Sequence, residues 1–305
     1  MIEPLARWTA RGIALLLVGP AAAWGSGMVR APDGSGATTL LTGDSLVAGV
    51  LALAIVASCA WFAAGVGAKL GDRHEAILST GFVLAWVAWS GGRLGEVLRL
   101  APESGTFVRL AVEAGLFGGI TVVALLIADR LSRRSASDEG LSLSLEGIRS
   151  GLAGKAGVPA LLASAGAGVA IAWLFARYDL PGQSLGTAFL GGIAAGIAAT
   201  SIVQSMTKDD RDAPEGSTGL VVPALLGLLI AGVVGPVLGM FVPGAGRVPE
   251  LLARGALPGW VLVSPVSWGA GAMIGVPMGV SFLHNRAVHG ASGDRGAGVP
   301  KVSSP

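Results

Sequence analysis

The chain has 305 residues, of which 52% are hydrophobic and 13% are charged, and it has a formal net charge of +2 and a mean hydropathy of +0.69. Soluble domains carry about 25% charged residues, so this composition favours an integral membrane protein. The small net charge gives no support to nucleic-acid binding. Cys59 is the single cysteine, which excludes a disulfide within the chain and a metal site built from cysteines.

Apolar runs of membrane-spanning length recur along the chain, since a helix needs about 20 residues to cross a hydrocarbon core of about 30 Å. We predict an all-α integral membrane fold of about eight transmembrane helices arranged as hairpins, at about 8–29, 46–68, 76–100, 106–129, 156–176, 183–206, 218–241 and 259–283. Residues 1–283 therefore form one transmembrane domain. The Gly/Ser-rich residues 284–305 are predicted to be a disordered cytoplasmic tail.

The first apolar segment has the layout of a signal peptide, because a basic start precedes an apolar middle and a run of small residues. It continues to Val29 and further spans follow, so we expect an uncleaved first helix. Eight spans place both termini on one side of the membrane. When that side is the cytoplasm, most of the 21 lysines and arginines are cytoplasmic, as the positive-inside rule requires. The prediction is a bacterial inner-membrane protein with both termini cytoplasmic.

Ionisable residues enter the predicted membrane region in the hairpin of residues 76–131. The two uncharged stretches of this hairpin are each shorter than a bilayer span, so both helices must take length from their charged ends. On antiparallel helices Arg93 and Glu113 then lie at the same height, and Glu96 and Arg109 nearly do. These four residues are a candidate intramembrane charge cluster.

Two interpretations of this cluster remain open. An ionisable residue inside a membrane commonly marks a functional site, and a short glutamate side chain reaches the surface less easily than an arginine. The alternative is a salt-bridged helix end, because Arg side chains extend to the headgroups along their own stems. The functional interpretation makes Arg93 and Glu113 the central pair.

A short internal repeat occupies the C-terminal half. VPALL occurs at Val158–Leu162 and again at Val222–Leu226, and LPG occurs at Leu180–Gly182 and again at Leu257–Gly259. In both copies VPALL begins one predicted helix and LPG precedes the next. We therefore predict that helices five and six and helices seven and eight form a duplicated hairpin with the two copies in parallel orientation.

Glycine accounts for 49 of the 305 residues, and small residues four apart let membrane helices approach closely. We predict helix packing at such positions, namely Gly115, Gly119, Gly192, Gly196, Gly235, Gly239, Gly271, Gly275 and Gly279. Packing within the chain is expected, and the alternative is a face for a second copy. Prolines are predicted to break the last two helices at Pro223, Pro236, Pro265 and Pro277. Such breaks can mark a transporter's substrate site, or neighbouring helices can simply accommodate them.

The sequence contains no metal, nucleotide or protease motif, so no cofactor is predicted and an enzyme is less supported than two other classes. One is a small-solute transporter or channel that uses the Arg/Glu pair. The other is a non-catalytic membrane subunit or scaffold that packs against partner helices through glycine-rich faces. Partners are then the lipid bilayer and a homo-oligomer or membrane complex. A transporter is expected to have a polar cavity between the repeats, and a scaffold is expected to be dry and to expose a glycine-lined face.

Overall fold

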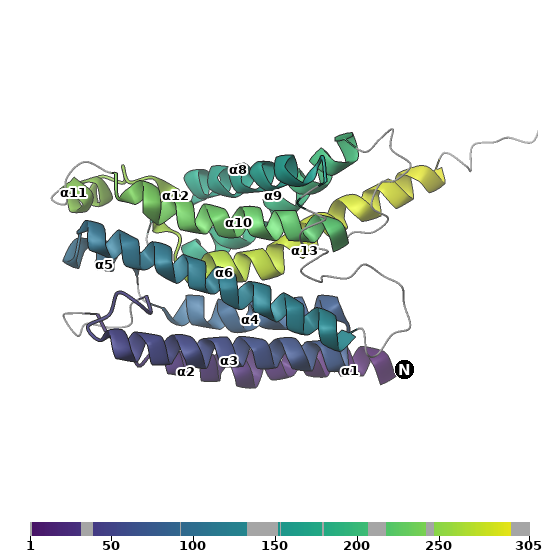
Figure 1. Ribbon diagram of the computed structural model, residues 1–305, viewed down its shortest axis with the longest axis horizontal. Helices are drawn as coiled ribbons and strands as arrows, with labels where there is room; N and C mark the ends of the chain where they lie inside the picture. The colour runs from purple at the N-terminus through teal and green to yellow at the C-terminus, as the bar shows by residue number, and fades with distance from the viewer. Residues whose placement is uncertain are drawn as a thin grey trace, which may run out of the picture.

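All regular elements in the described part of the chain are helices. The computed structural model describes residues 2–31, 39–91, 93–132, 152, 154–178, 180–206, 218–241 and 247–293. Figure 1 shows long helices running side by side as one elongated bundle. Their bounds are α1 (Ile2–Ile13), η1 (Ala14–Val18, a π-helical turn), α2 (Gly19–Ser26), α3 (Leu46–Leu70), α4 (Arg73–Ser90), α5 (Leu94–Leu100), α6 (Ser104–Ser132), α8 (Gly157–Phe175), α9 (Pro181–Met206), α10 (Thr218–Gly239), α11 (Arg247–Ala253), α12 (Gly259–Leu262) and α13 (Pro265–Gly293).

Six of the described helices are long and apolar enough to cross a membrane, judged by length and composition: α3, α6, α8, α9, α10 and α13. The prediction of eight spans is therefore supported for six. The other two predicted segments are helical as well, because α1, η1 and α2 follow one another without a break and α4 covers most of the third segment. Both run side by side with the long helices of the bundle in Figure 1.

Large apolar side chains cover much of the outside of the bundle. Leu16, Val47 and Leu162 expose 74%, 70% and 63% of their surface. Trp24, near the end of α2, and Trp89 and Trp173, near the ends of α4 and α8, are 73%, 62% and 61% exposed. An apolar surface with aromatic residues near the helix ends is typical of contact with lipid.

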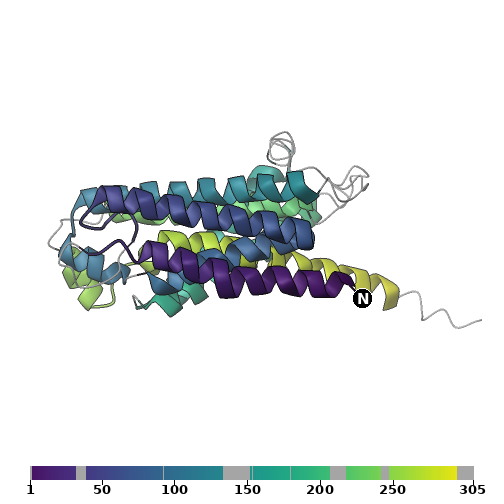
Figure 2. The same cartoon turned by 90° about the horizontal axis from the view of Figure 1, so that it is seen from below.

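The bundle has two ends, which are named here by what lies at them. The α5–α11 end holds the short helices α5, α11 and α12, and the terminal end holds the start of α1 and the end of α13 (Figure 1). The turned view in Figure 2 agrees that the start of α1 and the end of α13 lie at this second end.

Helix starts follow local capping rules. Ser45 caps α3 by accepting a hydrogen bond from Ala48 N at 3.3 Å, and Asp72 caps α4 by accepting one from Glu75 N at 3.0 Å. Helices α9 and α13 begin with Pro181 and Pro265, where proline lacks only an N–H that the first turn leaves unpaired anyway.

Two predicted helices are interrupted. The segment predicted at 76–100 divides into α4 and α5, because the chain leaves the helix at Gly91 with ψ 157° and consecutive glycines disfavour helix. The segment predicted at 259–283 divides into α12 and α13. Val263, the C-cap residue of α12, is extended at φ −83°, ψ 119°, and Pro265, the first residue of α13, disfavours helix at Ser264 before it.

The linker and the tail also differ from the prediction. Helix α11 lies between the helices predicted at 218–241 and 259–283, where no helix was predicted. Helix α13 continues to Gly293, ten residues beyond the predicted end at 283. The rest of the predicted tail, 294–305, lies outside the described residues.

Helix α13 occupies the middle of the bundle and packs against α4, α6, α9 and α10. Its contact with α9 is formed by glycines. A β-carbon on Gly192 would meet the Gly271 carbonyl and lie 3.0 Å from Gly275 Cα, and one on Gly196 would lie 3.2 Å from Gly279 Cα. Close backbone approach of this kind is what small residues at four-residue spacing allow.

Two glycines of α10 lie against aromatic rings, Gly232 against Trp268 and Gly239 against Phe107. Gly235 lies against the backbone carbonyl of Trp260. The Trp268 ring is 1% exposed, and it also touches glycines of α8 and α9. This ring fills the space between the two predicted repeat hairpins.

The prolines lie in two different settings. Pro223 and Pro236 lie inside α10 and Pro277 lies inside α13, and these helices are continuous through them. Pro265 alone among the four stands at a helix break. The prediction that all four prolines break helices is therefore wrong for three of them, since the surrounding helices accommodate the missing backbone bond.

Candidate functional site

The carboxyl group of Glu113 is the most deeply buried acidic group of the described residues. Glu113 lies in the first half of α6 and is 1% exposed. The Leu41 N–H donates to its Oε2 at 2.9 Å, and the Leu40 amide and the Thr39 hydroxyl lie against the same carboxyl. Oε1 is buried without a hydrogen-bond partner among the described residues. The turn 39–42 thus donates hydrogen bonds to the carboxyl group, and Oε1 remains without a hydrogen-bond partner among the described residues.

A small cavity of about 20 Å³ borders Glu113, a volume that accommodates about one water molecule. Its polar lining comes from separate elements: Ser26 at the end of α2, Thr39 of the turn, Glu113 of α6 and Ser264 at the α12–α13 break. The break of α13 at Pro265 is what brings Ser264 to this place. The described lining contains no lysine, arginine or histidine.

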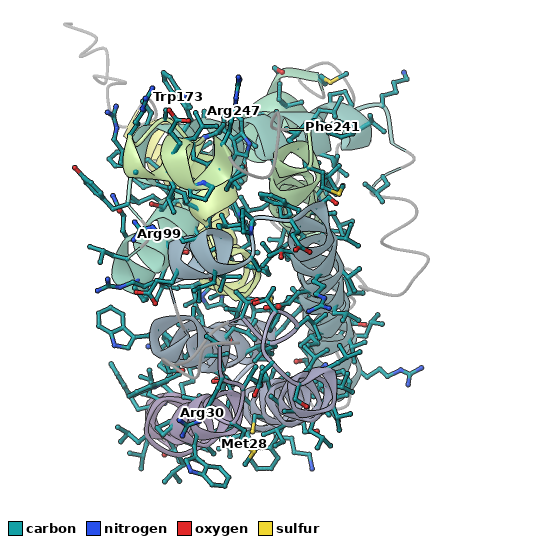
Figure 3. The ribbon with its side chains drawn as sticks, turned by 90° about the vertical axis from the view of Figure 1, so that its left-hand side faces the viewer. Met28, Arg30, Arg99, Trp173, Phe241 and Arg247 are labelled. Atoms are coloured by element: carbon teal, nitrogen blue, oxygen red, sulfur yellow. The ribbon has the colours of Figure 1, made fainter. Side chains whose placement is uncertain are left out.

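The predicted Arg93–Glu113 pair does not form among the described residues. Arg93 is the N-cap residue of α5 and lies 3.7 Å from Glu96, and both side chains are about half exposed. Arg109 is exposed. The reason is the break after α4 at Gly91, which places Arg93 outside a continuous helix and at the N-cap of α5, near Glu96. Figure 3 looks onto the α5–α11 end of the bundle, where Arg30, Arg99 and Arg247 also lie at the surface.

A second and larger cavity, of about 220 Å³, lies towards the terminal end. It is lined at its mouth by Asp72, Arg73 and His74 and deeper by Ile77 of α4 and Pro277 of α13. Both cavities therefore lie on the interface of α4 with α13, at opposite ends of it. We call this interface, together with the adjoining face of α6, the central seam.

The middle of the central seam is closed by apolar side chains. A β-carbon on Gly269 would lie 3.4 Å from Leu84, 3.7 Å from the Thr121 hydroxyl and 3.8 Å from Phe117. Leu84 and Phe117 are fully buried, and the Thr121 hydroxyl has no hydrogen-bond partner among the described residues. Glu113, Phe117 and Thr121 follow one another at four-residue spacing, so they share one face of α6.

Sequence reasoning missed a second buried carboxyl group. Glu75 is 2% exposed and accepts from both the Nε and the Nη2 of Arg11, the first at 2.8 Å. Arg7 lies 3.3 Å from Asp72. Arg7 and Arg11 are four residues apart and Asp72 and Glu75 are three apart, so each pair can present its charges on one side of its helix, which was the available signal. These pairs join α1 to the start of α4.

Three serines form a hydrogen-bonded cluster at the α12–α13 break. Ser184 Oγ accepts from Ser264 N at 2.9 Å and donates to Ser267 Oγ at 3.0 Å. Ser264 Oγ accepts from Ser267 N at 3.3 Å, as an N-cap residue does. The cluster fixes the unwound backbone beside the Glu113 cavity.

The two predicted packing glycines of α6 have surroundings different from those of the packing glycines in the other helices. A β-carbon on Gly115 or Gly119 would meet nothing within 4 Å. Exposed Val112, Leu116 and Val123 flank them. This glycine face therefore has no partner helix within the described chain.

The fold and the site define a helical membrane protein in which a buried carboxyl group faces an interhelical cavity. No group of three or more metal-ligating side chains (His, Cys, Asp or Glu) occurs in the described part. Comparison of the chain with protein-family models, with curated proteins and with solved structures finds no match in any of the three. Function must therefore be argued from the site itself.

Proposed function

We propose that this chain is a multi-span membrane transporter that moves a small solute along the central seam, with Glu113 at the α5–α11 end of the path. The observation that carries the proposal is the carboxyl group of Glu113, which lies deep in the bundle with one oxygen unsatisfied beside a cavity. A polar group without a partner in an apolar interior is costly, and ionisable residues at such depth commonly bind a transported species.

The arrangement of the cavities supports this proposal. A carrier needs a path that can open to either side of the membrane, and the two cavities lie at the two ends of the central seam. Leu84 and Phe117 close the middle, as expected for an occluded state. The predicted path between the repeat hairpins is replaced by one along the seam, because Trp268 fills the space between the hairpins.

Cysteine accessibility tests the path without knowledge of the substrate. In a Cys59→Ser background, Leu84→Cys places a thiol in the middle of the seam, and Ala195→Cys places one between α8 and α9, where the Ala195 carbonyl accepts from Ser164. Both positions are 0% exposed. We expect a membrane-impermeant thiosulfonate to modify Leu84→Cys in proteoliposomes and to leave Ala195→Cys unmodified. Equal protection of both thiols until the protein is denatured would refute the path.

The finer topology is part of the proposal. We infer eight spans, counting the α1–η1–α2 rod and α4, with both termini in the cytoplasm of a bacterial inner membrane. The start of α1 and the end of α13 lie at one end of the bundle (Figure 2), which supports an even number of spans. Reporter fusions after residues 31 and 283 check it, since the first should be external and the second cytoplasmic.

We also propose that α8 and α9 form one hairpin and that α10, α12 and α13 form its duplicate. VPALL lies near the start of α8 and of α10, and LPG lies at the start of α9 and of α12. Corresponding helices are neighbours, because Gly227 of α10 packs against Leu161 and Ser164 of α8, and Gly192 of α9 packs against Gly271 of α13. The second copy differs from the first in two ways. Its second helix is divided into α12 and α13, and its linker contains α11.

A membrane scaffold is the second candidate, favoured by the unpartnered glycine face of α6. Gly115 and Gly119 leave open space in which a helix of another chain can approach closely. Native mass spectrometry of the gently solubilised protein tests this. A stable partner that is lost in the Gly115→Leu/Gly119→Leu variant would support the scaffold, and a monomer unaffected by that variant would count against it.

A further inference from the structure

We infer that the Glu113 cavity is a binding site for a single sodium ion. The inference rests on the proposed function, since it names the ligand of the same site, and it makes that ligand a coupling or transported ion.

The charge of the site calls for a cation. Glu113 is 1% exposed, and no basic side chain is among the described residues that line its cavity. Two backbone N–H groups of the turn 39–42 approach the carboxyl group, but they carry only partial charges. A buried carboxylate that is ionised therefore requires a positive charge at Oε1, the oxygen without a partner.

The polar side-chain atoms of the described residues that line the cavity are oxygens. They come from the Glu113 carboxyl group and from the hydroxyls of Ser26, Thr39 and Ser264. Ser26 Oγ donates its hydrogen to the Ala23 carbonyl at 2.8 Å, so it presents lone pairs to any other neighbour. Carboxylate and hydroxyl oxygens suit a hard cation, and they do not suit an anion or a soft metal.

The helix break adds a second feature typical of sodium sites in transporters, where unwound backbone at the membrane interior coordinates the ion. The backbone between α12 and α13 leaves the helix at Val263, and Ser264 and Val266 line the cavity. Ser264 N donates to Ser184 Oγ, and the hydroxyls of Ser264 and Ser267 are hydrogen-bonded to each other, so this unwound segment is held in place.

Size and charge together select sodium. The cavity of about 20 Å³ holds about one water-sized particle, so it takes a single dehydrated ion, and the ionised carboxylate attracts the smaller sodium ion more strongly than potassium because their charges can come closer together. One carboxylate balances one positive charge, whereas a divalent ion would leave a net charge in an apolar interior, which is costly.

Thermal unfolding of the detergent-solubilised full chain, followed by tryptophan fluorescence, tests the inference. Sodium chloride is titrated against choline chloride at constant ionic strength, with potassium chloride as a third series. We expect a saturable rise in melting temperature with sodium, since a ligand that binds only the folded state stabilises it, and a smaller rise with potassium. The rise should persist in Glu96→Gln, a surface control, and be absent in Glu113→Gln.

A second variant keeps the test decisive if Glu113→Gln does not fold. Ser26→Ala removes one oxygen ligand and leaves the carboxyl group, and we expect it to weaken the sodium affinity by about ten- to a hundredfold. A melting temperature that responds equally to sodium and choline would overturn the inference. So would a response to pH alone, which would mean that a proton neutralises Glu113.

The two proposals fail in distinguishable ways. A sodium response together with complete protection of Leu84→Cys would retain the ion site and refute the transport path. Modification of Leu84→Cys without any sodium response would retain the path and refute the ion site.

Discussion

Replacing Gly275 by alanine tests the packing at the centre of the bundle. A β-carbon at this position would lie 2.9 Å from both Gly192 Cα and Ile193 N, and it would also meet the Phe189 carbonyl. All three atoms are backbone of α9, so they cannot move aside as a side chain can. Overpacking of this kind typically costs about 1–3 kcal/mol, and we expect a separation of α9 from α13.

Gly119→Ala is the matched control, because Gly119 also lies inside a membrane helix and a β-carbon there would meet nothing within 4 Å. Alanine has a higher helix propensity than glycine by up to about 1 kcal/mol, and this gain applies to both variants. The difference between them therefore isolates the steric term, for which we expect about 1–3 kcal/mol. Equilibrium unfolding in mixed micelles measures it. If Gly275→Ala were as stable as Gly119→Ala, the close contact of α9 with α13 would be refuted.

Three further substitutions test other contacts, each by the same unfolding measurement. Trp268→Ala should destabilise by about 3–5 kcal/mol, as expected for a buried tryptophan, and a loss below about 1 kcal/mol would contradict the contacts drawn for its ring. Ser264→Ala removes a helix cap beside the Glu113 cavity and should destabilise by about 1–2 kcal/mol. Arg11→Gln leaves the buried Glu75 carboxylate without its charged partner and should cost about 1–3 kcal/mol, whereas Arg254→Gln, which breaks an exposed pair, should cost less than about 1 kcal/mol.

Hydropathy was sufficient to find the helical bundle but not the breaks within it. The apolar segment 76–100 contains Ser90 and Gly91 without any fall in hydropathy large enough to separate two helices. Whether glycine ends a membrane helix depends on what packs there, and this is a tertiary property. Pro265 was recognisable as a break, but Pro223 and Pro277 have the same local signal and lie inside continuous helices.

Part of the candidate site could be found from the sequence. Glu113 was identified because its charge interrupts an apolar run, and that argument holds regardless of its partner. Its partner was predicted from the symmetry of a hairpin, whereas the observed donor is Leu41 N, 72 residues away in the chain. Backbone N–H groups are the same for every residue type, so no sequence pattern could have indicated this contact.

The central place of α13 has a consequence for biosynthesis. Translation proceeds from the N-terminus, so α13 is the last of the described helices to leave the ribosome, yet α4, α6, α9 and α10 all pack against it. Until it inserts, the glycine face of α9 and the α4 side of the seam have only lipid as a neighbour. Assembly of the described bundle therefore waits for α13, and a chain truncated before residue 265 lacks the helix against which α4, α6, α9 and α10 pack.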